Sequence, residues 1–231
     1  MRATIIPFLA LLLLAGASCT SSEIGNSKDV NPDAVFFDYK IWSEEGKEDA
    51  VVKLQYRMGG PDGTTLVLNE PSKVFVDGKE LPVDSTKFEG AYYEFVQPLA
   101  QFAGKHTIRF IDLNGKEFKE EFEFRPFSLD PDISDTISRS DLVFSFKGLE
   151  DGQPVQVWMS DTLYSSNDIN QVDTIRQGKI MLSSARLSDL APGPVHLLFT
   201  WESEKVLNET SREGGLLRKT YSLRREIELK D

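Results

Sequence analysis

His106–Phe124 reads HTIRFIDLNGKEFKEEFEF, and this stretch decides the fold. Its first eight residues are rich in β-forming types, and Asn114-Gly115 is a strong hairpin-turn signal. After the turn, apolar and charged residues alternate, which places one set on each face of a strand. The apolar set is Phe118, Phe122 and Phe124, and the charged set is Lys119, Glu121 and Glu123. The stretch therefore predicts a β-hairpin with one buried and one solvated face.

The same period of two extends toward the N-terminus. VVKLQYRM at 51–58 alternates cleanly, with Val52, Leu54, Tyr56 and Met58 expected on one face. VFVDGKEL at 74–81 reads as a second hairpin that turns at Asp77-Gly78. Turns this closely spaced leave little room for a helix, so residues 34–126 are predicted to form an antiparallel β-sandwich.

A second series of strands follows a break in the pattern. Residues 127–141 contain proline with several acidic and hydroxyl residues, and they are interpreted as a linker between domains. The strand-like stretches beyond it lie within 142–231 and end in KTYSLRREIEL, where Arg225 interrupts an otherwise apolar face. The chain is therefore predicted to be all-β, with a second sandwich at 142–231.

The two halves also show a distant internal similarity. LAQFAGKHTIRF aligns with LSDLAPGPVHLLF once one residue is inserted, which matches Phe102 with Leu190, Gly104 with Gly193 and Phe110 with Phe199. Two units of about 100 residues, each with a glycine-containing turn before the penultimate strand, resemble bacterial immunoglobulin-like domains. The resemblance implies two tandem antiparallel immunoglobulin-like β-sandwiches, and modules of this kind usually accompany enzymes rather than act as enzymes.

The N-terminal sequence predicts where in the cell the protein is located. LLLLAGASCT at 11–20 ends an apolar run with small residues and the chain's single cysteine, Cys19. With Arg2 ahead of it, the segment resembles a bacterial lipoprotein signal, although Gly16 stands where that family usually has leucine. The resemblance implies a signal peptide at 1–18, acylation of Cys19 (palmitate being a typical acyl group) and a flexible tether over 19–33. The alternative is an ordinary cleaved signal with Cys19 incidental.

This signal favours a location in the cell envelope, with the protein anchored to a membrane through lipid. Thr20 and Ser21 lack the aspartate that resemblance to inner-membrane lipoproteins would require, which favours the outer membrane. The net charge of −11 argues against nucleic acid as a partner. With one cysteine, the fold has no internal disulfide and depends on its core.

Catalytic patterns are sparse. His106 and His196 fall in different predicted domains at positions that the internal alignment does not match. Neither HExxH nor GxSxG is present, and no pair of carboxylates is singled out by its spacing. The chain is therefore predicted not to be an enzyme, with a carbohydrate-active enzyme that uses a carboxylate cleft kept as an alternative.

The predicted linker holds the best metal candidate. Asp130, Asp132, Ser134 and Asp141 have an oxygen-ligand spacing that resembles a twelve-residue calcium loop. Asp135 replaces the glycine of that loop, Asp141 replaces its bidentate glutamate, and Pro131 lies inside it. Calcium is the only cofactor considered, and the alternative is a solvated acidic linker.

Two further surface features point to modification and to partners. Ser85, Thr136, Thr162 and Thr174 each follow an aspartate in a sequence similar to an O-glycosylation sequon of some Gram-negative bacteria, and all four are expected in loops. Arg218, Lys219, Arg224 and Arg225 form a basic cluster on an acidic chain. That cluster predicts a surface for a partner, and its alternative is a solvated strand face.

Together these patterns predict a non-catalytic binding or structural module that recognises another envelope protein or a glycan. A small-ligand or carbohydrate binder is the first alternative, and a concave pocket with convergent carboxylates or exposed aromatics would favour it. A passive spacer is the second alternative.

Overall fold

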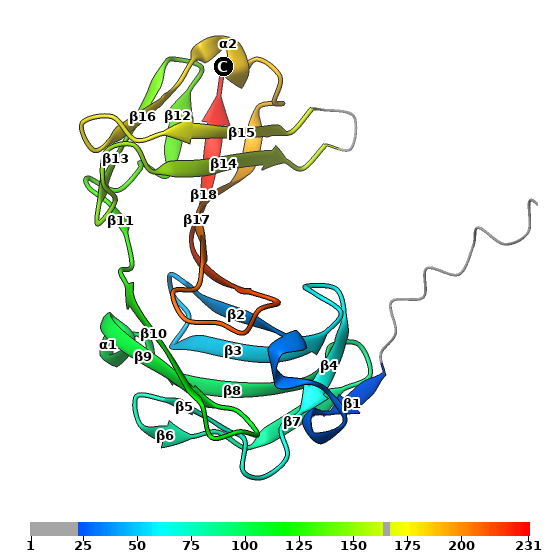
Figure 1. Cartoon of the computed structure of the whole chain (residues 1–231). Coiled ribbons are helices and arrows are strands. Elements are labelled where there is room, and N and C mark those ends of the chain that lie inside the picture. The colour runs from blue at the N-terminus through cyan, green and yellow to red at the C-terminus, as the bar shows by residue number, and fades with distance from the viewer. Residues whose placement is uncertain (1–22, 164–166) are drawn as a thin grey trace, which may run out of the picture.

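The structure of the protein is a computed structural model that describes residues 23–163 and 167–231. The predicted signal peptide and Cys19 lie outside the described residues. The described chain is almost entirely β-structure, and it forms two tandem immunoglobulin-like β-sandwiches one above the other (Figure 1), as the sequence predicted. Within the described residues, the two helices are four residues long and neither could cross a membrane.

The first sandwich packs a four-stranded sheet against part of a larger sheet. The smaller sheet consists of β10 (Glu117–Phe124), β9 (Gly104–Ile111), β5 (Lys73–Val76) and β6 (Lys79–Glu80). The larger sheet contributes β1 (Ile24–Asn26), β4 (Thr64–Val67), β3 (Asp49–Met58), β2 (Val35–Glu44), β8 (Gly90–Pro98) and β7 (Val83–Thr86). The hairpin predicted at His106–Phe124 is β9 and β10, paired in antiparallel register from Gly104↔Phe124 to Ile111↔Glu117.

Aromatic side chains fill the first core because the alternating positions of both sheets face inward. The ring centroid of Phe37 on β2 lies 5.1 Å from that of Phe110 and 5.2 Å from that of Phe118. Tyr56 on β3 lies 4.3 Å from Phe110. The predicted inward face of β3 is confirmed at three positions, whereas Met58 at the strand end is 44 % exposed.

The second sandwich uses the remaining strands. Its smaller sheet consists of β11 (Ser128–Leu129), β13 (Leu142–Lys147) and β16 (Lys179–Leu182). Its share of the larger sheet consists of β12 (Thr136–Ser138), β18 (Gly215–Lys230), β17 (Gly193–Val206), β14 (Pro154–Asp161) and β15 (Ile169–Thr174). Phe144 and Phe146 of β13 pack edge-on against Phe199 of β17, with centroids 4.8 Å and 5.2 Å away.

The long hairpin β17–β18 belongs to both sandwiches. Inside the second sandwich, residues 195–200 of β17 pair with β14, and residues 193–200 pair with the end of β18. At the other end, Gly215–Ser222 of β18 pairs in parallel with Phe37–Glu44 of β2, so one eleven-stranded sheet runs through the whole molecule. The predicted second unit at 142–231 therefore needs correction, because the tip of its last hairpin completes the first sandwich.

Two further expectations about connections need correction. The predicted tether is structured over 24–34, because β1 pairs with β4 and Ser27 Oγ accepts a hydrogen bond of 2.8 Å from the Asn69 amide. Two short turns follow, η1 (Ser27–Asp29) and η2 (Pro32–Ala34). The predicted linker at 127–141 is likewise part of the second sandwich, since β11 pairs with β13 and β12 pairs with β18.

The internal similarity predicted from sequence is visible in the backbone. A four-residue helix precedes the matched strand in both halves, α1 (Leu99–Phe102) before β9 and α2 (Ser184–Leu187) before β17. The aligned glycines begin those strands with matching positive φ angles, 135° at Gly104 and 124° at Gly193. Both backbones need the conformational freedom of glycine at this point.

Candidate functional site

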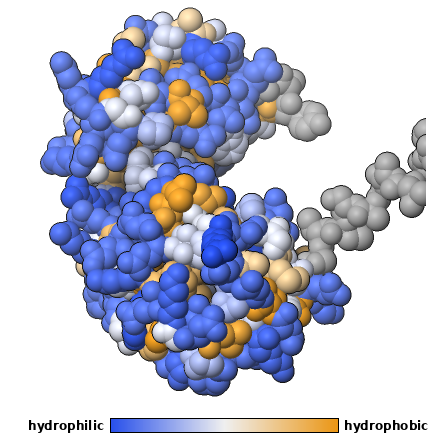
Figure 2. Space-filling model, in the orientation of Figure 1, coloured by the Kyte–Doolittle hydropathy of each residue, from blue (hydrophilic) through white to orange (hydrophobic). Residues whose placement is uncertain are grey.

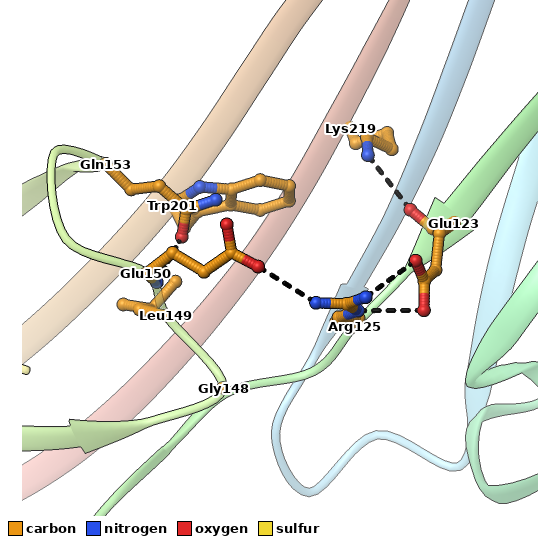
Figure 3. Close-up of a pocket in the computed structure, with 8 residues that line it drawn as sticks. All are labelled: Glu123, Arg125, Gly148, Leu149, Glu150, Gln153, Trp201 and Lys219. Carbon is orange, nitrogen blue, oxygen red and sulfur yellow. Dashed lines mark hydrogen bonds and ion pairs between the residues drawn. The ribbon is translucent and has the colours of Figure 1, made fainter.

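Two concave sites stand out, and the first lies at the waist between the sandwiches. It is a cavity of about 210 Å³ lined by the end of β10, the turn after β13 and the middle of the β17–β18 hairpin (Figure 3). Its lining residues are Glu123, Arg125, Gly148, Leu149, Glu150, Gln153, Trp201 and Lys219.

Arg125 bridges the two sandwiches across this cavity. Its guanidinium meets both carboxylate oxygens of Glu123, at 2.8 Å from Nε and 2.8 Å from Nη2 (Figure 3). Its Nη1 reaches Glu150 Oε1 of the second sandwich at 3.0 Å. Hydrogen bonding to Arg125 lowers the pKa of Glu123, and the same bond raises the pKa of Arg125.

Lys219 and Trp201 form the inner wall of the waist. Lys219 Nζ donates a hydrogen bond of 2.9 Å to the Glu123 carbonyl and lies 5.4 Å from the centroid of the Trp201 ring. Burial lowers the pKa of Lys219, and the positive charge of Lys205 acts in the same direction. The Trp201 side chain is buried.

The predicted basic cluster is engaged inside the molecule. Arg225 forms ion pairs with Glu45 of the first sandwich and, at 2.8 Å, with Asp132 of the second. Arg224 Nε lies 3.7 Å from Glu44 Oε1, at the end of β2. Together with Lys219, these side chains connect the sandwiches, so the structure does not present the four basic residues as one free face.

The waist is therefore a joint. Its cavity is smaller than the roughly 300 to 1,000 Å³ of a typical small-ligand site. Tyr221 of β18 closes the apolar side of the joint, with its ring centroid 5.2 Å from Phe127 and 6.2 Å from Phe124. A buried carboxylate, Glu120 on β10, holds the hairpin tip by pairing with Lys205 and accepting a 2.8 Å hydrogen bond from the Asn208 amide.

The second concave site is an open cavity of about 610 Å³ on the first sandwich. Its floor comes from the face of β2, β3 and β18 that points away from the aromatic core, where alternate residues are polar. The turn between β7 and β8 forms one rim and carries Lys87 and Phe88. The loop before β4 carries Asp62 on another rim.

Asp38 is the centre of the floor. Its side chain is 3 % exposed and is shared by three cations: Lys40 at 3.2 Å, Arg57 at 3.4 Å and Arg218 at 3.1 Å. Gln55 Oε1 accepts a 2.5 Å hydrogen bond from Arg57, and Gln55 Nε2 donates to the Glu89 carbonyl at 2.7 Å. The contact of Arg57 with Asp38 is made by its buried Nε, and at 3.4 Å it is an ion pair longer than a good hydrogen bond.

Sequence reasoning missed this cavity, although two signals pointed to it. Asp38 is a charged residue within the apolar run VFFDYKIW, and a buried charge in such a run needs partners. Phe88 is an isolated aromatic in the polar turn STKFEG, and the structure leaves it 99 % exposed.

The proposed calcium ligands do not come together. Asp130 pairs with Lys147 at 2.5 Å, Asp132 pairs with Arg225, and Asp141 accepts a 2.7 Å hydrogen bond from the Ser184 amide. Ser134 Oγ accepts the Thr136 amide at 3.3 Å. Over residues 23–163 and 167–231, no three His, Cys, Asp or Glu side chains gather as a metal site would require. The structure therefore does not assemble the predicted loop site, since each carboxylate has a different protein partner.

The four O-glycosylation candidates are all exposed, as such modification requires. Their predicted loop setting is correct only for Thr162, which follows β14. Ser85, Thr136 and Thr174 lie on β7, β12 and β15 instead, because short strands extend into these polar stretches.

The two histidines lie far apart in the fold. His106 on β9 is buried, stacks on Phe102 with centroids 4.0 Å apart, and contacts Asp77 Oδ2 through Nδ1 at 2.7 Å. His196 on β17 is half exposed, and its Nδ1 lies 3.6 Å from Glu226. The two histidines therefore lie in different sandwiches, and each has a local carboxylate partner.

No protein-family model and no curated protein sequence matches the chain. Solved structures show a distant likeness in fold. One is a tetra-tandem repeat from the extending region of a large adhesion protein, with 14 % identity over 85 % of this chain, a TM-score of 0.29, and 50 % of that structure covered. The chain thus spans half the length of that repeat structure.

Two others have similarly low scores. DIP-gamma IG1+IG2 has 11 % identity over 85 % of this chain and 95 % of its own, with a TM-score of 0.23. A 1.5-MDa bacterial ice-binding adhesin, described for host cell surface retention, has 8 % identity over 87 % of this chain and 66 % of its own, with a TM-score of 0.24.

Proposed function

We propose that this protein is a lipid-anchored, non-catalytic binding module of the cell envelope, most consistent with the outer membrane. The observation that supports it best is the shared β17–β18 hairpin, which joins two sandwiches into one continuous sheet. A continuous sheet holds the surfaces of the two sandwiches in a fixed arrangement relative to each other. The apolar run ending at Cys19 supplies the lipid anchor.

The open cavity is the binding surface in this proposal. It combines a concave polar floor with an exposed aromatic rim, which is the combination expected of a ligand-binding module. On the face drawn in Figure 2, the surface is largely hydrophilic, and hydrophobic residues form separate groups.

The anchor is tested by metabolic labelling with an alkyne fatty acid in a Gram-negative host that expresses the full chain. The wild type is expected to be labelled and to sediment with membranes, whereas Cys19→Ala is expected to be unlabelled. Ser21→Ala is the matched control, because it changes a neighbouring polar residue and leaves the cysteine in place. Equal labelling of the wild type and Cys19→Ala would remove the lipid anchor from the proposal.

The binding role is tested by chemical cross-linking in native membranes, followed by mass spectrometry. A reproducible envelope partner, protein or glycan, supports the module. Neutralising Arg218 or Arg225 is unsuitable as the test of a contact surface, because both side chains hold the fold together. Phe88→Ala is the better variant, since its side chain makes little contact with the fold.

A further inference from the structure

We propose that the open cavity of the first sandwich binds a carboxylated saccharide, with the acid group at the Asp38 cluster and a sugar ring against Phe88. This inference rests on the binding role proposed above and is independent of the lipid anchor. Its carriers are Lys40, Arg57, Lys87, Phe88 and Arg218, all of which line one cavity of about 610 Å³.

The charge of the floor favours an anion. Lys40, Arg57 and Arg218 all lie within 3.4 Å of the single carboxylate of Asp38. Glu204 pairs with Arg218 at 2.6 Å and balances one more positive charge. Three cations against two carboxylates leave one positive charge uncompensated, in a chain whose net charge is −11.

Arg57 also has hydrogen-bond donors to offer. Gln55 Oε1 and the Gly63 carbonyl accept hydrogen bonds from its two terminal nitrogens, at 2.5 Å and 3.1 Å, and its buried Nε faces Asp38 Oδ2 at 3.4 Å. Each terminal nitrogen carries two N–H groups and makes one hydrogen bond among the described residues, so one N–H on each remains for a ligand acceptor. Guanidinium groups suit carboxylates because their planar donors match the two acceptor oxygens.

The rim favours a sugar over a plain anion. Phe88 exposes 99 % of its surface and offers only a ring, with no polar handle. The face of an aromatic ring is electron-rich and attracts the weakly positive C–H groups of a sugar ring. Among the described residues, Lys87 and Asp62 on the rim have no ion-pair partner. Lys87 is available to a further carboxylate of the saccharide, and Asp62 can accept hydrogen bonds from its hydroxyl groups. An acidic peptide would use the cations but would have less need of the bare ring.

The test uses the purified protein and isothermal titration calorimetry with trigalacturonate as the probe. The methyl ester of the same trisaccharide is the neutral control, and triglutamate is the acidic peptide control. We expect saturable binding of trigalacturonate and binding of the ester weaker by roughly tenfold or more, the loss typical of a charge-assisted hydrogen bond. Triglutamate is expected to bind much more weakly.

Two variants separate the ring from the charge. Phe88→Ala is expected to weaken trigalacturonate binding about 2- to 10-fold, and Val172→Ala, an exposed apolar residue of the second sandwich, is expected to have no effect. Lys87→Gln should weaken binding of the acid and leave binding of the ester unchanged. Lys230→Gln, exposed at the end of β18, is its matched control.

Three results would overturn the proposal. They are the absence of saturable trigalacturonate binding, equal affinity for the acid and its ester, and triglutamate affinity that matches the saccharide and survives Phe88→Ala. The last result would assign the cavity to an acidic protein partner. A cross-linked envelope partner recovered without saccharide binding would leave the binding module standing and reject only this ligand.

Discussion

The waist and the open cavity are both lined by mixed charges, yet they differ in how those charges are used. At the waist, Arg125, Lys219 and Arg225 each have an acceptor on a neighbouring segment. In the cavity, three cations share the single carboxylate of Asp38, and Glu204 pairs with only one of them, Arg218. Charges that are fully paired stabilise the joint between the sandwiches, whereas a positive charge without a partner is available to a ligand. Changes at the joint should therefore alter stability, and changes at the cavity rim should alter binding.

The largest effect is expected at Glu120, which anchors the hairpin tip. Glu120→Ala leaves Lys205 without its partner and the Asn208 amide without an acceptor. Because Lys205 is partly exposed, the expected loss is that of a charge-assisted hydrogen bond and of one backbone acceptor, about 2 to 4 kcal/mol of unfolding free energy, measured by urea denaturation. The control is Glu121→Ala on the solvent face of the same strand, where a change of at most about 1 kcal/mol is expected. Similar losses for both variants would contradict the role of the tip as an anchor.

Arg225→Ala should have an intermediate effect, because it removes the charge that links Glu45 to Asp132. Loss of hydrogen bonds to charged groups predicts about 1.5 to 3 kcal/mol of destabilisation. Distances between spin labels on β15 and β6 should also broaden, as the sandwiches gain freedom. Arg176→Ala on the exposed turn after β15 is the control. An unchanged distance distribution would show that the aromatic contacts of Tyr221 fix the waist without help.

The same pair predicts a pH dependence. The hydrogen bond from Arg225 lowers the pKa of Asp132 below its ordinary value of 3.8. A lowered folded-state pKa contributes stability that is complete above the unfolded value and is lost as pH falls through the folded one. Wild-type stability should therefore fall below about pH 4 more steeply than that of Arg225→Ala, as followed by urea titrations between pH 2 and 6. Parallel curves for the two proteins would contradict this linkage.

The smallest effect on stability is expected at Phe88. Its side chain is almost fully exposed, so Phe88→Ala should change the unfolding free energy by less than about 0.5 kcal/mol. By comparison, Phe110→Ala, in the core of the same sandwich, should lower the unfolding free energy by about 3 to 5 kcal/mol. A large loss of unfolding free energy in Phe88→Ala would mean that the ring packs against the protein in solution. Rim residues would then contribute to stability, as the joint residues do.

Much of the fold was predictable because it depends on local patterns. The alternation in His106–Phe124 and the Asn114-Gly115 turn specify a hairpin without reference to the rest of the chain. The aligned glycines before β9 and β17 likewise report a local backbone requirement. The parallel pairing of β18 with β2 was not predictable in this way, because nothing in either strand alone names its partner.

The sites were harder for the same reason. The basic residues of β18 suggested an open surface, and their acidic partners, Asp38, Glu44, Glu45 and Asp132, are supplied by distant segments. Ion pairs between segments far apart in sequence produce no periodic pattern in the sequence from which they could be predicted. The apolar run VFFDYKIW also hides the two faces of β2, because the face opposite the core carries Asp38 beside large hydrophobic neighbours. Only the fold shows that Asp38 is surrounded by cations.

The shared hairpin also determines when, during synthesis of the chain, the first sandwich can finish folding. Arg218 and Asp38, which meet where β18 joins β2, are 180 residues apart in the chain. Pairing between such distant segments requires a very long loop to close. The chain loses entropy on closure before the new contacts can offset that loss, and this slows folding. Until Gly215–Ser222 has been synthesised, the outer edge of β2 lacks its neighbour. An emerging chain therefore stays incompletely folded for most of its synthesis, which would suit the export across a membrane that we propose for it.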